Sequence, residues 1–184
     1  MNTLATQATS VSDLANELDF IVGDHISKIC SSSLAKINSQ NHCAHFVSHA
    51  LNIHKKGTAD CKTFTYKDKH NPAVESSFIR VNELFNNCKK RGKWDQVKAC
   101  GSYLLIFATR ESNIDTTKTP PTMEDHPVKH IGIYYNGYVW HYSNTLRKVK
   151  KDLLSEWINT FTRVYADKSN PENKVVFYYG IYSE

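Results

Sequence analysis

Apolar residues three or four positions apart predict four helices in the first half of the chain. The predicted helices span residues 12–22, 26–37, 41–51 and 76–88. Alternating or continuous apolar runs predict strands at 63–66, 102–108, 130–135, 138–143 and 174–182, with one short helix at 151–160. Helices that largely precede the strands in the chain indicate an α+β fold with an antiparallel sheet.

A chain of 184 residues is expected to form a single domain spanning residues 1–184, with its core motifs between residues 41 and 143. Residues 1–10 are small and polar, and we expect them to be disordered. Residues 111–129 contain three prolines and several threonines. We expect a long loop there, and loops of this length are usually functional or disordered.

Asn136-Gly137 lies between two alternating apolar runs, which is the strongest short-range signal for a β-hairpin. A two-residue turn at this point places Gly132 opposite His141. Because side chains alternate between the two faces of a strand, His130 and His141 then share one face as diagonal neighbours. Gly132 would leave this face open to a group from another element.

Cys43 follows Asn41, a suitable N-cap, at the start of the helix predicted for residues 41–51. The positive end of the helix dipole favours a thiolate, so we expect the pKa of Cys43 to fall. Its backbone N–H is expected to help form an oxyanion hole. A Cys–His–X triad needs a histidine near the thiol and a third polar group that holds the histidine. We therefore expect Cys43 to lie over the face shared by His130 and His141, close to Gly132.

Both stretches resemble motifs of the NlpC superfamily, a group of papain-like cysteine peptidases that cleave the bacterial cell wall. His42-Cys43-Ala44-His45-Phe46-Val47 is similar to the family's Asp-Cys-Ser-Gly-Phe-Val at a helix start. His130-Ile131-Gly132-Ile133-Tyr134 is similar to His-Val-Gly-Ile-Tyr, and His141-Tyr142 to the His-Ala that follows it. The strand at 101–107 resembles the family's Gly-Asp-Leu-Val-Phe-Phe, so the resemblance covers roughly residues 41–143.

The resemblance implies a papain-like NlpC-type fold, in which the nucleophile helix packs on a central antiparallel sheet. It implies Cys43 as nucleophile, His130 as general base and His141 as the orienting third residue, with no cofactor. The implied reaction cleaves an amide bond in peptidoglycan stem peptides, between D-glutamate and the diamino acid, through a thioester. His42 and His45 stand where the family has aspartate and glycine. We expect the residues near the substrate to include His42, His45, Gly132, Tyr142 and Ser143.

The N-terminus lacks the basic region and the apolar run of a Sec signal peptide. We expect synthesis in the cytoplasm, export by another route and action in the periplasm of a target cell, as a monomer. A compact basic chain of this kind resembles the peptidoglycan hydrolases that type VI secretion exports as antibacterial toxins. That resemblance implies an immunity protein and secretion machinery as partners. No run of about eighteen apolar residues predicts a membrane span.

Other functions stay open. A CHAP-like amidase, or a papain-like protease or acyltransferase acting on a protein or lipid, also has its cysteine before its histidine. A catalytically inactive binding module on the same fold is a further alternative. The chain holds 23 Lys and Arg against 18 Asp and Glu, a net charge of +5 that favours an anionic wall. No nucleic-acid-binding motif accompanies this charge, so nucleic acid is not an expected partner.

His45 and His49 are four residues apart on a predicted helix, a spacing that can bind zinc. The glutamate of the His-Glu-x-x-His motif is missing, so we expect no metal and a packing role for both histidines. The five cysteines form no Cys-x-x-Cys pair. Four of them are expected to be ordinary buried thiols, with a disulfide between the last two left open: Cys30, Cys61, Cys88 and Cys100.

Overall fold

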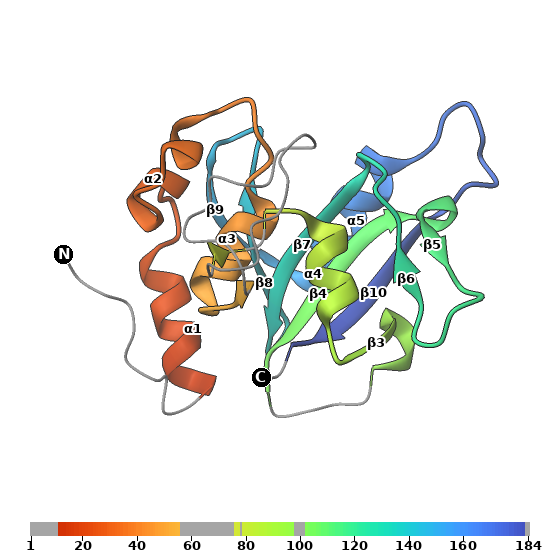
Figure 1. Cartoon of the computed structure of the whole chain (residues 1–184), viewed down its shortest axis with the longest axis horizontal. Helices are drawn as coiled ribbons and strands as arrows, with labels where there is room; N and C mark the ends of the chain where they lie inside the picture. The colour runs from red at the N-terminus through yellow and green to blue at the C-terminus, as the bar shows by residue number, and fades with distance from the viewer. Residues whose placement is uncertain (1–10, 56–75, 78, 98–101, 183–184) are drawn as a thin grey trace.

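The computed structural model describes residues 11–55, 76–77, 79–97 and 102–182. A six-stranded antiparallel sheet forms its centre, in the order β3-β10-β4-β7-β8-β9 (Figure 1). In that order the strands are β3 (Lys90–Lys93), β10 (Val175–Ile181), β4 (Leu104–Arg110), β7 (Lys129–Tyr135), β8 (Tyr138–Ser143) and β9 (Lys148–Leu153). The α+β class and the antiparallel sheet predicted from the sequence are confirmed.

Five α-helices accompany the sheet in the described residues. They are α1 (Val11–Phe20), α2 (Ile26–Ile29), α3 (Cys43–Ala50), α4 (Val81–Asn87) and α5 (Leu154–Tyr165). α3 and α4 lie on one face of the sheet and α5 lies on the other (Figure 1). None of the described helices has the length and apolar character needed to cross a bilayer.

Several predicted boundaries were wrong. The helix expected at 26–37 is divided into α2 and a 3-10 turn at Ser33–Lys36. The helix expected at 76–88 begins only at Val81, because residues 76 and 77 form β2 with β1 (His54–Lys55). The strand expected at 63–66, the disorder expected at 1–10, and Cys61 and Cys100 all lie outside the described residues.

Two hydrophobic cores lie on opposite faces of the sheet. The larger core joins α3 and α4 to Phe107 of β4 and Ile131 of β7. The smaller core joins Trp157 and Phe161 of α5 to Ala108, the next residue along β4. Neighbouring residues of a strand thus face different cores, as the two-residue period of a strand requires.

The hairpin register predicted from Asn136-Gly137 is confirmed. β7 pairs with β8 through Ile133–Trp140, Tyr134–Val139 and Tyr135–Tyr138. Both turn residues have positive φ, 46° at Asn136 and 86° at Gly137, as a type I′ turn requires. His130 and His141 therefore share one face of the sheet.

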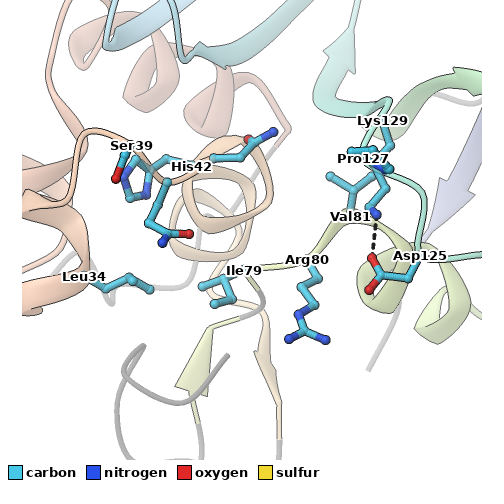
Figure 2. A pocket seen from close by; sticks show the side chains of 11 residues that line it. Leu34, Ser39, His42, Ile79, Arg80, Val81, Asp125, Pro127 and Lys129 are labelled. Atoms are coloured by element: carbon cyan, nitrogen blue, oxygen red, sulfur yellow. Dashed lines mark hydrogen bonds and ion pairs between the residues drawn. The ribbon is translucent and has the colours of Figure 1, made fainter. Parts of the chain in front are cut away.

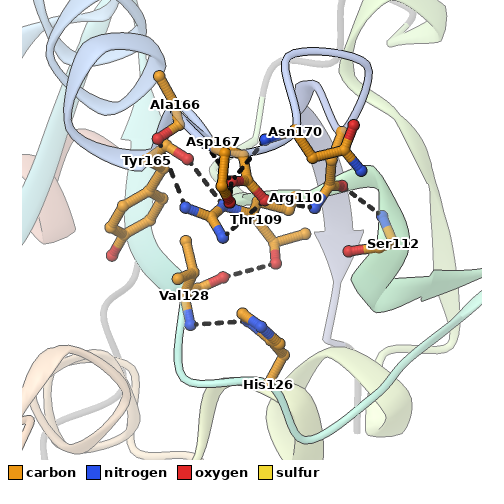
Figure 3. A network of polar contacts seen from close by, with 11 residues as sticks. Thr109, Arg110, Ser112, His126, Val128, Tyr165, Ala166, Asp167 and Asn170 are labelled. Atoms are coloured by element: carbon orange, nitrogen blue, oxygen red, sulfur yellow. Dashed lines mark hydrogen bonds and ion pairs between the residues drawn. The ribbon is translucent and has the colours of Figure 1, made fainter.

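The segment 111–129, expected to be a long loop, contains the short strand pair β5 (Ile114–Asp115) and β6 (Thr122–Met123). Its last residues are fastened directly before β7, because the Thr109 hydroxyl donates to the Val128 carbonyl at 2.7 Å (Figure 3). The Val128 N–H in turn donates to Nδ1 of His126 at 3.2 Å.

Arg110 ties the end of α5 to the sheet. Its guanidinium donates to the Tyr165 carbonyl at 2.9 Å and pairs with Asp167 at 3.1 Å (Figure 3). A cation at the end of a helix satisfies carbonyls that have no partner within the helix and offsets the negative end of the dipole. The face of the sheet that α5 covers is therefore closed by both polar contacts and apolar packing.

Candidate active site

Three side chains on adjacent strands form a hydrogen-bonded relay. Nε2 of His130 on β7 lies 2.9 Å from Nδ1 of His141 on β8. Nε2 of His141 lies 2.9 Å from Oδ2 of Asp152 on β9. Asp152 also pairs with Lys150 at 2.8 Å. We call His130, His141 and Asp152 the histidine relay.

The relay has a direction that the charge of Asp152 sets. The hydrogen bond from His141 holds the pKa of Asp152 at about 2, so this carboxylate is ionised and can only accept. His141 must then carry its proton on Nε2. Burial lowers the pKa of His141, so the neutral ring accepts on Nδ1 from Nε2–H of His130. The remaining lone pair of the relay sits on Nδ1 of His130, where a general base needs it.

Aromatic side chains of α5 exclude water from the histidine relay. The His130 ring stacks on Phe161 with centroids 4.3 Å apart, and the Trp157 ring centroid lies 6.2 Å from that of His130 and 6.3 Å from that of His141. His130 is only 3% exposed. Burial, followed by the neighbouring His141, lowers the pKa of His130 well below its usual value.

Cys43 does not lie over the face that the two histidines share. α3 packs on the opposite face of the sheet, and Cys43 belongs to the core that contains Ile131 rather than the core that contains Trp157. The position expected next to Gly132 is filled, since a Cβ on that glycine would lie 2.5 Å from Cγ1 of Val139. The missing side chain therefore makes room for β8 and not for the thiol.

The Cys43 thiol instead lies beside the strand that carries His130. The Ile131 N–H, one residue after His130, is close enough to favour the thiolate. Cys43 and His130 are both described, and no hydrogen bond joins them. The side chain is fully buried, and this burial raises the pKa of Cys43 to about 12. The lowered pKa expected from the helix dipole was wrong, because desolvation outweighs the dipole.

The start of α3 is held by a pair of asparagines. Oδ1 of Asn41 accepts from the Cys43 N–H at 3.0 Å and from Nδ2 of Asn144 at 2.8 Å. Oδ1 of Asn144 accepts from the His42 N–H at 2.8 Å. The Asn41 side chain therefore accepts from the first turn of the helix, as an N-cap side chain does. By the helix boundary, however, His42 is the N-cap residue. The oxyanion role expected for the Cys43 N–H stays a prediction; in this structure that N–H donates to Asn41.

The other residues expected near the substrate are divided between the two faces of the sheet. His42 and His45 are buried on the α3 side, and their Nδ1 atoms lie 3.2 Å apart. Tyr142 packs edge-on against His42 at 5.8 Å on that same side. Ser143 accepts from the Leu146 N–H in the turn after β8, so it serves that turn.

A pocket of about 300 Å³ lies where α3, α4 and β7 begin (Figure 2). Asn41 and His42, which precede the thiol, line one side, and Lys129, which precedes His130, lines another. Lys129 pairs with Asp125 at 2.7 Å within this pocket (Figure 2). The pocket therefore adjoins the chain positions of both Cys43 and His130.

Sequence reasoning missed Asp152 and Lys150. No strand was expected in the basic run from 147 to 151, which precedes the helix expected at 151–160. It is the edge strand β9, and α5 begins only at Leu154. The alternation of lysine with the apolar Val149 could have indicated this strand, since Val149 is buried between two lysines.

No known protein family, curated protein or solved structure matches this chain. The resemblance to the NlpC superfamily is therefore a prediction from two short motifs. What can be assigned rests on the chemistry of the described residues.

The histidine relay predicts a pH-dependent stability. The pKa of His130 is lower in the folded protein than the usual 6.5, so the unfolded chain binds more protons and stability falls as the pH drops below about 6.5. A histidine that stays neutral when folded contributes up to about 2 kcal/mol of this loss between pH 7 and pH 5. We expect His130→Asn to lose correspondingly less stability than the unmodified chain over this interval, measured by urea unfolding.

The groups that face His130 are His141, with Asp152 and Lys150 behind it. Asp152 loses its contribution only as the pH approaches 2, so it adds little between pH 7 and pH 5. If the unmodified chain and His130→Asn lose equal stability between pH 7 and pH 5, then His130 is not held neutral in the folded protein.

Proposed function

We propose that this chain is a cysteine hydrolase of the NlpC type, with Cys43 as nucleophile and the histidine relay as its base. One observation carries the proposal: the relay leaves a lone pair on Nδ1 of His130, at the end of β7 beside which the Cys43 thiol lies. A histidine base aligned by a half-buried carboxylate, on a strand beside which a thiol at a helix start lies, supplies the groups that nucleophilic catalysis needs.

In the proposed reaction, Nδ1 of His130 takes the thiol proton as Cys43 Sγ attacks the carbonyl carbon of an amide. The C–N bond breaks, and His130 gives its proton to the leaving amine. A thioester remains on Cys43. Water then attacks the thioester, with His130 as base, which releases a carboxylic acid and restores the thiol. His141 and Asp152 hold the ring of His130 and stabilise its charged form during both steps.

The proposed substrate is a stem peptide of peptidoglycan, and the proposed scissile bond joins D-glutamate to the diamino acid. The two sequence motifs support this choice. So does the pocket beside the start of α3, where Arg80, Lys129 and Asp125 offer both signs of charge to a peptide that carries carboxylates and an amine. Action in the periplasm of a target cell, with an immunity protein as partner, is part of the same proposal.

A second candidate function is a binding module without catalysis. The full burial of Cys43 and its pKa of about 12 favour this alternative, since a buried protonated thiol is a poor nucleophile. Catalysis through Cys43 requires that substrate binding, or opening of the α3 N-terminus, exposes the thiol to the pocket.

Digestion of purified sacculi distinguishes the two candidates. We expect the full chain to release muropeptides whose new amino and carboxyl termini, identified by mass spectrometry, lie within the stem peptide. Cleavage of a protein or lipid panel without action on sacculi would support the CHAP-like or papain-like alternative. Retention on sacculi with no new termini would support the binding module. If the chain neither cleaves sacculi nor is retained on them, the cell-wall assignment is contradicted.

A further inference from the structure

A second cluster of reactive side chains joins α2 to α3, apart from the histidine relay. The thiol of Cys30 and one ring nitrogen each of His45 and His49 lie within 4.8 Å of one another. Cys30 directly follows α2 as its C-cap, and the two histidines are one turn apart on α3. Cys30 and His45 are buried and His49 is half-buried.

The hydrogen bonds around His45 leave one ring nitrogen unused. Nε2 of His42 lies 3.1 Å from the Ile37 carbonyl, to which it can only donate. In a neutral ring, Nδ1 of His42 is then an acceptor, and it lies 3.2 Å from Nδ1 of His45. His45 therefore donates from Nδ1 and keeps its lone pair on Nε2. That Nε2 atom is buried and has no hydrogen-bond partner among the described residues.

A histidine whose one nitrogen donates to a fixed acceptor and whose other carries a buried lone pair is arranged as a metal ligand. We propose that Cys30, His45 and His49 bind a zinc ion. One thiolate and two imidazoles form a ligand set that zinc prefers and that magnesium and calcium do not. Three protein ligands leave the fourth tetrahedral position to water.

The spacing of the three groups suits this ion. Zn–S and Zn–N bonds of about 2.3 and 2.0–2.1 Å put tetrahedral ligand atoms about 3.3–3.6 Å apart. A shift of roughly 1 Å brings ligand atoms separated by 4.8 Å to this distance. Binding releases the proton of the Cys30 thiol to solvent, because the thiolate is the ligand. The prediction of no metal considered histidines of one helix alone, whereas the third ligand comes from α2.

The proposed ion would fasten α2 to α3, the helix that begins at Cys43. This role does not depend on the proposed hydrolase activity, because a binding module would need the same fastening. Metal binding can therefore be tested on its own, by affinity and spectroscopy, with no enzymatic assay.

The test titrates the reduced, metal-free full chain with Zn²⁺ in competition with a chromophoric chelator. We expect one equivalent to bind, and Cys30→Ser and His45→Gln each to weaken the affinity at least about 100-fold. Cys88→Ser and His126→Gln are matched controls, since both residues lie outside the cluster, and their affinity should be unchanged.

Cobalt gives a second measurement that needs no variant. Co²⁺ added to the unmodified chain should show tetrahedral absorption together with a thiolate-to-metal charge-transfer band, and Zn²⁺ should displace it. Stoichiometry below one equivalent, unchanged affinity in Cys30→Ser, or a cobalt spectrum without the thiolate band would each overturn the proposal.

Discussion

Replacement of Cys43 by alanine is expected to lower the rate of amide hydrolysis by at least about 10⁴-fold, because no other group can form the thioester. The fold should persist. Removing one buried heavy atom costs roughly 0.5–1.5 kcal/mol, as other small deletions in cores do. The rate of release of new amino termini from sacculi measures the first effect, and urea unfolding measures the second.

Cys88→Ala is the matched control for this substitution. Cys88 is also a buried thiol in the larger core, and burial raises its pKa to about 12 as well. It bonds to the Leu84 carbonyl of α4 and has no place in the proposed chemistry. We expect its substitution to cost similar stability and to leave the rate unchanged. A Cys43→Ala protein within tenfold of the unmodified rate would exclude the thiol as nucleophile.

The hairpin that carries the two histidines could be predicted because its information is local. A two-residue turn at Asn136-Gly137 fixes the register, and the register fixes which side chains are diagonal neighbours. These two facts make His130 and His141 diagonal neighbours, and the structure places their ring nitrogens 2.9 Å apart. Similarly, the amphipathic spacing of α3 predicted the helix on which Cys43 lies.

The face on which α3 packs could not be predicted in the same way. β7 is buried on both faces, with Ile131 on one and His130 on the other, so alternation alone does not say which face a given helix covers. α3 packs on the face that carries the larger core. Trp157 and Phe161 of α5 cover the histidines on the other face. The pKa of Cys43 failed as a prediction for the same reason, since burial is a property of the whole fold.

Asp152 was missed because its strand, β9, is rich in lysine. β9 is an edge strand, and lysines on an edge discourage pairing with further strands. Their charge resembles that of a solvated loop, so the alternation that buries Val149 is easily overlooked. The carboxylate acts through His141, two strands away from His130, and such a contact is visible only when three strands are aligned.

Trp157→Ala is expected to give the largest loss of stability, about 3–5 kcal/mol, because it empties the centre of the smaller core. Trp157 is fully buried and touches Phe161, with ring centroids 4.6 Å apart, as well as both histidines of the relay. The free energy of unfolding at pH 7, from urea titration, measures this loss. Trp94→Ala is the matched control, since Trp94 borders the same core but is only half-buried, and it should cost clearly less.

Trp157→Phe separates the loss of volume from the loss of polarity. The indole N–H of Trp157 is buried without a partner in the part of the chain that the structure describes, and leaving such a donor unpaired costs about 1–3 kcal/mol. Phenylalanine removes this donor and keeps most of the ring, so its net cost should stay below about 1.5 kcal/mol. Water admitted by the alanine variant should also raise the pKa of His130 toward its usual value, because burial is the main cause of its lowering. Equal losses in the alanine and phenylalanine variants would mean that α5 does not close the relay by packing.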